Sequence, residues 1–325
     1  MSKKIDEFRM PAEWEPQKSV WIAWPHNKND WPGLFEKIPN VVGKIIKYLT
    51  KHQRIDLLVN NSKSIDSTRI YLKKIGCNIS NIKFHKLKTD RLWLRDSGPI
   101  FLVNKKKGKK TMLDFKFNAW SKYKNFRNDN KINSLISKYL NIKSILPKKV
   151  YSKKFVRVVM EGGAFDNNGS GSILLTKECL LSSKQERNKG FKKIDYENLF
   201  SKYLNAKNFI WLNKGIVGDD THGHIDDIAR FVSKSTIMIA VENNRSDKNY
   251  KALKENLKIL SKSYNENGKK FTIIKIPMPS PVVIDKTRVP ASYLNFFISN
   301  KTVLVPVFNA VSYTHLRAHE TVLDI

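Results

Sequence analysis

Three short motifs in this sequence each carry a carboxylate, and they recur at a single interval. The carboxylates are Asp96 in Arg-Asp-Ser-Gly-Pro, Glu161 in Glu-Gly-Gly and Asp226 in His-Ile-Asp, and neighbouring carboxylates are 65 residues apart. Equal spacing indicates one repeated supersecondary unit that brings each carboxylate to the same place. Carboxylates that converge on one pocket repel each other unless a cation lies between them. A planar guanidinium suits such a pocket, because it offers paired donors to each carboxylate.

His224 precedes Asp226 by two residues and adds an acid–base group to the predicted site. On a strand the two side chains would point to the same face, and the carboxylate would orient the imidazole and stabilise its protonated form. Two other interpretations stay open: a structural histidine, and a divalent-metal site in a dense polar cluster. That cluster comprises Asp219, Asp220, His222, His224, Asp226 and Asp227. The equal spacing favours the guanidinium site, and no metal is expected.

Apolar periodicity around the motifs predicts alternating helices and strands. Predicted helices span residues 38–52, 62–75, 129–140, 196–204 and 251–264, and Ser62 is expected to cap the second. Predicted strands include residues 20–24, 55–59, 82–84, 100–103, 156–160, 172–175, 209–212, 236–241 and 271–276. The recurring order, counted cyclically, is strand, helix, strand, strand, and a fourth copy has Asn295 in place of the carboxylate. Such units, stacked around an axis, predict a propeller-like α/β ring.

Composition narrows the class of protein. The net charge is +31, with 60 basic and 29 acidic residues, which would suit a nucleic-acid-binding protein. The lysines are spread through every segment without a nucleic-acid-binding motif, so a solvated basic surface is the favoured interpretation. Neither a signal peptide nor a membrane-spanning run is recognisable, which predicts a cytoplasmic protein. The two cysteines, Cys77 and Cys179, are too few for a disulfide framework and are expected to be structural thiols.

Several motifs together resemble the agmatine deiminase family, relatives of the bacterial peptidyl-arginine deiminases. They are Met10–Pro16, Trp24–Asn27, Asp30–Gly33, Trp93–Pro99, Glu161–Gly163, Gly218–Asp226, Ala229–Phe231, Pro277–Pro279 and Ser292–Phe296. The resemblance runs from about Met10 to Asn309 and predicts a single catalytic domain over residues 1–309. It implies a pentein fold of five ββαβ units, which agrees with the ring argued from the spacing.

The resemblance also implies a chemistry. It is a cofactor-free hydrolysis of agmatine to N-carbamoylputrescine and ammonia, a step of polyamine biosynthesis. A cysteine thiolate attacks the guanidinium carbon, ammonia leaves, and water releases the ureido product. By the matched positions, Asp96 and Asp226 would clamp the guanidinium nitrogens, and His224, supported by Glu161, would be general acid and then base. Substrate-binding roles fall to two further residues: Trp93 would pack the aliphatic chain, and Asp220 would contact the substrate or order the site.

The sequence departs from the family pattern at its end. The family nucleophile is a cysteine in a Gly-rich stretch near the C-terminus, and neither Cys77 nor Cys179 occupies such a stretch. The segment Val311–Thr321 resembles a translated library-preparation adapter, so residues 310–325 are expected to be an artefactual tail. The chain is therefore predicted to be incomplete at the closing unit and inactive. Peptidyl-arginine deimination is the alternative activity, and a homo-oligomer is a further possibility.

Overall fold

The structure, a computed structural model, describes residues 7–104, 106–151 and 154–308. Within them, three sheets share one order: an antiparallel pair followed by a parallel third strand. The sheets are β4 (Ile100–Asn104), β5 (Lys109–Leu113) and β6 (Ser144–Ile145); β9 (Phe165–Asn167), β10 (Ser172–Thr176) and β11 (Asn208–Leu212); and β12 (Ala229–Phe231), β13 (Thr236–Val241) and β14 (Thr272–Pro277). The artefact predicted for residues 310–325 lies outside the described residues.

One long helix connects the second and third strands of each of these sheets. The helices are α4 (Asp129–Leu140), α6 (Lys193–Leu204) and α7 (Tyr250–Ser261). Helix α7 buries Leu253, Asn256 and Leu260 on one face, the spacing of an amphipathic helix packed on a sheet. A parallel pair needs such a crossover, whereas the antiparallel pair needs only a turn. The ββαβ unit inferred from the sequence is therefore present three times in the described residues.

The first sheet differs, because β1 (Ser19–Ala23), β2 (Arg54–Val59) and β3 (Ile82–Lys86) are all parallel. Helices α1 (Ile38–Leu49) and α2 (Ser62–Lys74) form its two crossovers. The predicted Ser62 cap is wrong: Asn61 caps α2, and its side chain accepts a hydrogen bond from the Ser64 backbone N–H at 2.8 Å. Asn and Ser are both good N-caps, so the sequence alone could not choose between neighbours.

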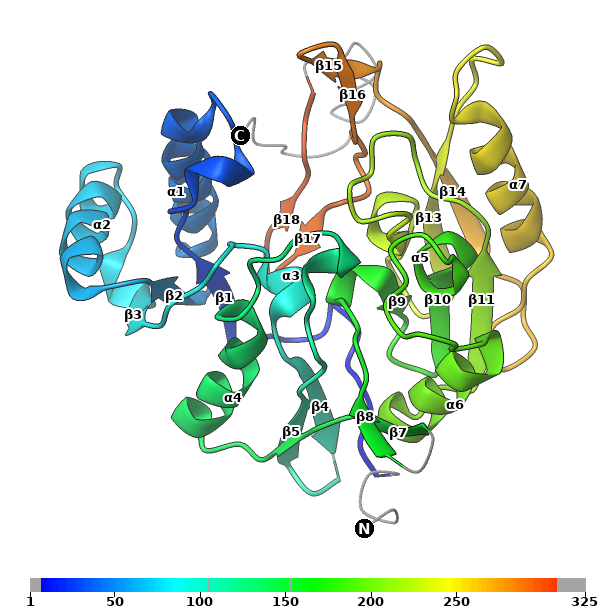
Figure 1. The fold of residues 1–325 in the computed structure, drawn as a ribbon, viewed down its shortest axis with the longest axis horizontal. Helices are drawn as coiled ribbons and strands as arrows, with labels where there is room; N and C mark the ends of the chain where they lie inside the picture. The colour runs from blue at the N-terminus through cyan, green and yellow to red at the C-terminus, as the bar shows by residue number, and fades with distance from the viewer. Residues whose placement is uncertain (1–6, 105, 152–153, 309–325) are drawn as a thin grey trace.

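The last described strands lie beside the first sheet (Figure 1). β17 (Phe297–Ile298) and β18 (Val303–Leu304) pair antiparallel, and Leu304 belongs to the same apolar core as residues of α1 and β2. Two further hairpins are β7 (Lys148–Tyr151) with β8 (Lys154–Arg157), and β15 (Val282–Ile284) with β16 (Thr287–Val289). The strand predicted over 156–160 therefore ends at Arg157, and beyond it Val159 forms only an isolated bridge with Lys116.

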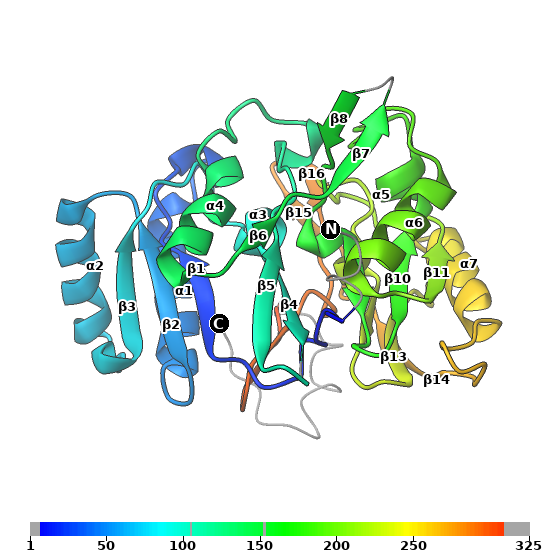
Figure 2. The ribbon, with the colours of Figure 1, turned by 90° about the horizontal axis from the view of Figure 1, so that it is seen from below.

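The sheets surround a centre made of short helical turns. Helix α3 (Leu94–Ser97) and the 3₁₀ turn η6 (Gly162–Ala164) pack together, and η6 also packs against the 3₁₀ turn η7 (Ile225–Asp227). In Figures 1 and 2, α2 and α7 lie on opposite outer sides of the molecule and α3 lies between them. Among the helices of the described residues, none combines the length and apolar character needed to cross a bilayer.

Candidate active site

The acidic motifs meet because each turn precedes the antiparallel pair of one sheet. Asp96 lies in α3, Glu161 directly precedes η6, and Asp226 lies in η7. His224 is the residue before η7, with φ of −57° and ψ of 142°. The prediction that His224 and Asp226 share a strand is wrong, because the chain turns at Ile225. The turn still brings their side chains together, with His224 Nδ1 3.9 Å from Asp226 Oδ1.

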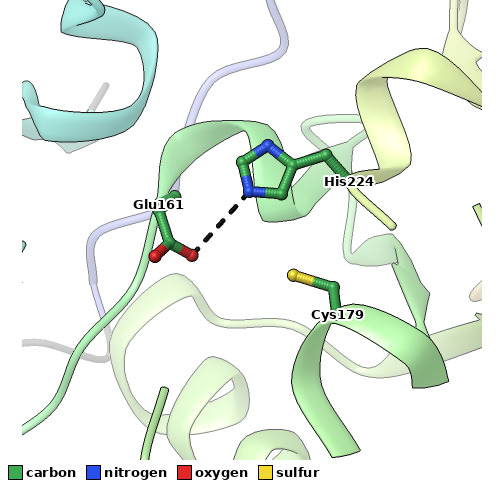
Figure 3. Close-up of side chains that lie close together, drawn as sticks. All are labelled: Glu161, Cys179 and His224. Carbon is green, nitrogen blue, oxygen red and sulfur yellow. Dashed lines mark ion pairs between the residues drawn. The ribbon is translucent and has the colours of Figure 1, made fainter. Parts of the chain in front are cut away.

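His224 is surrounded by carboxylates on both sides of its ring. Its Nδ1 also lies 3.9 Å from Asp96 Oδ1, and its Nε2 lies 3.9 Å from Glu161 Oε2 (Figure 3). Glu161 and His224 are almost fully buried, and Asp226 is only 4 % exposed. Three carboxylates of the predicted site, Asp96, Glu161 and Asp226, are therefore gathered around the fourth residue, His224.

Gly163 makes this close approach possible. Its backbone N–H donates to Asp96 Oδ1 at 2.9 Å. A Cβ atom at this position would lie 2.6 Å from His224 Nδ1 and 2.8 Å from both Asp226 Oδ2 and Asp96 Oδ1. Only glycine leaves room for three ionisable side chains around one backbone position, which explains the Glu-Gly-Gly motif physically.

Burial and mutual charge shift the pKa values of the gathered groups. Burial alone would lower the pKa of His224, but the Asp96 carboxylate, Cys179 and Glu161 outweigh it and raise the pKa well above its ordinary value. Burial would raise the pKa of Glu161, but Arg187 and His224 hold it below its ordinary value. Burial raises the pKa of Asp226 to about 6 despite the nearby His224 and Arg95. The site therefore favours a protonated imidazole among carboxylates.

Asp227, the residue after Asp226, has charged neighbours that differ from those of Asp226. Burial and the Asp226 and Asp219 carboxylates raise its pKa to about 8. Asn295 donates a hydrogen bond to Asp227 Oδ1 at 2.9 Å. Asn295, the residue of the fourth copy that replaces a carboxylate, thus contributes an amide donor beside the other three motifs.

Asp226 contacts a network of arginines and carboxylates. The site predicted from the sequence did not include this network. Arg95 Nε lies 3.7 Å from Asp226 Oδ2, and Arg95 also donates to Glu13 Oε2 at 3.1 Å. The same Glu13 oxygen accepts a bond of 2.5 Å from Arg230, whose Nε lies 3.5 Å from Asp166. Glu13 belongs to the Met10–Pro16 motif, so the signal for it was in the sequence without an assigned role.

A loop organised by Asp219 sets the position of His224. Asp219 Oδ2 accepts the backbone N–H groups of Gly223 (2.6 Å) and His224 (3.0 Å). Its Oδ1 accepts the Thr221 N–H at 2.8 Å. An aspartate that accepts several backbone donors stabilises a turn, and this one fixes the entry into η7. His222 points elsewhere, with Nε2 3.1 Å from Ser182 Oγ.

Trp120 holds the second oxygen of Asp96. Its Nε1 donates to Asp96 Oδ2 at 2.9 Å, and Trp120 has a left-handed backbone with φ of 59°. The flanking Ala119 and Ser121 also have positive φ. Left-handed backbone is costly for residues other than glycine, so this turn is a backbone outlier at the site. Hydrophobic periodicity cannot reveal such a turn, so the sequence alone does not identify Trp120 as part of the site.

A cavity of about 1530 Å³ opens onto the site. Asp96, His224 and Asp226 line it, as do the two predicted substrate-binding residues, Trp93 and Asp220. Trp93 is 42 % exposed and lies 5.7 Å from the Trp31 ring, centroid to centroid. Asp220 is exposed and paired with Lys122 and the Tyr123 hydroxyl. These two residues therefore line the same cavity as Asp96, His224 and Asp226.

The surroundings of Cys179 differ from those expected of a purely structural thiol. Its sulfur, Glu161 and His224 have ligand atoms within 4.8 Å of one another. The contact arises because Thr176 accepts the Cys179 N–H and donates to the Gly223 carbonyl. This bond ties the start of α5 (Lys177–Leu181) to the His224 loop. A contact between neighbouring units is invisible in local sequence.

Cys77 lies elsewhere, in the core between α1 and β2. Burial raises the pKa of its thiol to about 11, and the thiol donates weakly to the Gly43 carbonyl at 3.8 Å. Neither cysteine lines the cavity in the described part of the chain.

A buried imidazole lies among carboxylates beside a large cavity, which combines negative charge with an acid–base group. A model of the Porphyromonas-type peptidyl-arginine deiminase family matches residues 9–322. The chain belongs to this family. A relative from Legionella pneumophila (strain Paris), provisionally named an agmatine deiminase, is 33 % identical over 310 residues, which are 95 % of this chain and 85 % of the relative.

Solved structures agree with the family. A cysteine-to-serine variant of the C. jejuni agmatine deiminase with substrate bound is 29 % identical, with a TM-score of 0.81 and coverage of 95 % of this chain and 85 % of that one. An agmatine deiminase of Enterococcus faecalis is 24 % identical, with a TM-score of 0.83 and coverage of 99 % and 91 %. The mixed α/β fold described above is therefore the fold of the agmatine deiminase structures.

Proposed function

We propose that this chain is built to bind the guanidinium group of agmatine for hydrolysis to N-carbamoylputrescine and ammonia. Asp96 and Asp226, which both lie beside Gly163, would clamp the guanidinium nitrogens. His224 would transfer protons to the leaving ammonia and from the attacking water, with Glu161 orienting it. Trp93 would pack the aliphatic chain, and Asp220 would contact the substrate or order the site. The same proposal places the protein in the cytoplasm, in polyamine biosynthesis.

One observation carries this proposal above all. Asp226 Oδ1 is buried and has no hydrogen-bond partner among the described residues, although the residue lines the cavity. A buried acceptor without a donor costs free energy. A guanidinium between Asp96 and Asp226 would supply donors in a geometry that favours paired bonds. Names of relatives support agmatine as the substrate, since the Legionella protein and the C. jejuni structure both carry that name.

We also propose that the fold is a ring of five ββαβ units that the described residues do not close. The support is topological: β17 and β18 form only a pair, and β1 is an edge strand with no antiparallel neighbour in the described residues. Deimination of this type needs a cysteine nucleophile, and no described cysteine lines the cavity. The 325-residue chain is therefore expected to bind agmatine without hydrolysing it.

Sequencing the source DNA beyond the codon for Asn309 tests the incomplete ring. A frame that continues for about one more unit, with a Gly-rich stretch that contains His and Cys, would support it. Ureido product formed from agmatine by the 325-residue chain alone would contradict the proposed inactivity.

Calorimetric titration tests the guanidinium site itself. Agmatine should bind the 325-residue chain, and putrescine, which has an amine in place of the guanidinium, should bind far more weakly. Asp226→Asn should abolish agmatine binding, whereas Asp66→Asn, on the exposed surface of α2, should leave it unchanged. Equal binding of agmatine and putrescine would contradict a guanidinium clamp. Stronger binding of an arginine peptide than of agmatine would favour the alternative, peptidyl-arginine deimination.

A further inference from the structure

A second set of polar atoms meets on the far side of His224 from Asp96 and Asp226. It consists of Glu161, Cys179 and His224, whose ligand atoms lie within 4.8 Å of one another in a fully buried position. Figure 3 shows the Cys179 sulfur pointing from α5 into the space between the Glu161 carboxylate and the imidazole. The carboxylate, the thiol and the imidazole together offer one oxygen, one sulfur and one nitrogen atom as possible metal ligands.

Two of these three possible ligand atoms have no hydrogen-bond partner among the described residues. They are Glu161 Oε2 and His224 Nε2, both buried and 3.9 Å apart. At that distance the two atoms form an ion pair when His224 is protonated, but not a hydrogen bond, which requires about 3.2 Å or less. A cation between the two atoms would contact both of them.

The second carboxylate oxygen of Glu161 and the second ring nitrogen of His224 face other charged groups, as is usual for metal-binding residues. Arg187 Nε donates to Glu161 Oε1 at 3.1 Å, and both side chains are fully buried. This leaves Oε2 as the free oxygen. His224 Nδ1 faces the carboxylates of Asp96 and Asp226. Metal-bound histidines usually direct the second ring nitrogen toward a carboxylate, which fixes the ring and makes it a better ligand.

We propose that Glu161, Cys179 and His224 bind one thiophilic divalent cation, with Zn²⁺ as the best fit. Zinc accepts this nitrogen, oxygen and sulfur set at bond lengths of about 2.0–2.3 Å, which places ligand atoms about 3.5 Å apart. The three atoms lie within 4.8 Å of one another, so they need to close by no more than about 1.3 Å to reach that separation. Metal binding would displace the proton from His224 Nε2 and the proton of the Cys179 thiol to solvent, after which one carboxylate and one thiolate would balance both charges of the cation. Three protein ligands leave a fourth position for water or another small ligand.

The site differs from the metal site considered in the sequence. Asp219, Asp220 and His222 are engaged in other contacts, and the proposed ligands include a cysteine that the sequence analysis treated as structural. The cation would use the His224 and Glu161 atoms that deimination would need, so metal and guanidinium chemistry would compete. The proposal goes beyond the deiminase function and does not depend on it.

Titration with Co²⁺ as a spectroscopic substitute for Zn²⁺ tests the proposal without any measurement of activity. The chelator-treated 325-residue chain should bind one equivalent of Co²⁺ and develop a thiolate-to-cobalt charge-transfer band, and added Zn²⁺ should remove the band. Cys179→Ala should abolish the band. Cys77→Ala is the matched control and should retain it, because these two are the only cysteines in the chain.

His224→Ala keeps the thiol and tests the second ligand. Its Co²⁺ dissociation constant should rise by more than the roughly 10- to 100-fold that follows loss of a group hydrogen-bonded to a ligand. Circular dichroism and melting temperature should show that each variant is folded before titration. A band that persists in Cys179→Ala, or no band at one equivalent of Co²⁺ in the folded parent chain, would overturn the proposal. Agmatine binding by the same samples is scored separately, so failure of one proposal does not decide the other.

Discussion

At the scale of single residues, the site depends on Gly163, because a residue with a Cβ atom would not fit at this position. Gly163→Ala would push a methyl group into His224, Asp226 and Asp96 at distances below 3 Å. Overpacking of this kind typically costs about 1–3 kcal/mol. We expect Gly163→Ala to lower the free energy of unfolding by that amount and to abolish agmatine binding, measured by urea unfolding and calorimetry.

Gly43→Ala is the comparison for Gly163→Ala. Its added Cβ would lie 2.8 Å from the Ile75 Cδ1 atom, which is the movable end of a side chain. Gly43 lies inside α1, far in sequence from the acidic motifs. Agmatine affinity should stay at the level of the parent chain. Retained agmatine binding in Gly163→Ala would show that the three carboxylate and imidazole groups do not need their present spacing.

At the scale of elements, Glu13 joins segments that are far apart in sequence. It accepts from Arg95 in α3 and Arg230 in β12, and its Oε1 accepts the Ile298 backbone N–H at 2.7 Å. Removing one partner of a largely buried ion pair costs about 3–5 kcal/mol, because the other charges stay buried. We expect Glu13→Gln to lower the free energy of unfolding by about 3 kcal/mol in urea titrations.

Glu36→Gln applies the same chemical change to an exposed carboxylate. Within the described residues, Glu36 pairs with Lys28 alone, at 3.6 Å, and both side chains are largely exposed. Exposed pairs contribute about 0–1 kcal/mol, so this variant should unfold close to the parent chain. If Glu13→Gln and Glu36→Gln are equally stable, Glu13 is not a junction between elements.

Asp129, in the first turn of α4, makes stability depend on pH. Burial raises its pKa from 3.8 to about 7, although the backbone N–H groups of Asp90 and Arg91 donate to it and oppose the rise. Between those values the folded protein holds a proton that the unfolded chain releases. The contribution of this group therefore favours folding below its ordinary pKa and is lost as the pH rises to about 7.

Asp129→Asn keeps the acceptor oxygen and removes the ionisation. We expect this variant to be more stable than the parent at about pH 8 and to show a smaller loss of stability between about pH 4 and about pH 7. Urea midpoints across this range measure the effect. Parallel curves for the two proteins would mean that Asp129 is ionised in the folded state throughout.

At the scale of the whole molecule, the net charge of +31 opposes the approach of a cation. Salt shortens the Debye length from about 30 Å at 0.01 M to about 8 Å at 0.15 M and screens that repulsion, while buried contacts are screened much less. Agmatine association should therefore become faster with added salt, measured by stopped-flow tryptophan fluorescence. A rate that falls with salt would mean that the cavity mouth itself attracts cations.

The sequence predicts some features of the fold and the site better than others. The helices with strong apolar periodicity, such as residues 129–140, and the convergence of Asp96, Glu161 and Asp226 follow from local pattern and equal spacing. Features that depend on contacts between units could not be predicted. The Cys179 thiol reaches His224 through a bond between Thr176 and Gly223, and Trp120 reaches Asp96 through a left-handed turn. Neither contact has a periodic signature.

A crystal structure of the 325-residue chain with agmatine would test the central claim most directly. We predict that the guanidinium lies at the inner end of the cavity, with its nitrogens within hydrogen-bond distance of Asp96 and Asp226 and its carbon beside the His224 ring. Its aliphatic chain should extend past Trp93 toward Asp220. Agmatine held elsewhere, with Asp226 Oδ1 still without a donor, would contradict the assignment of these carboxylates to guanidinium binding.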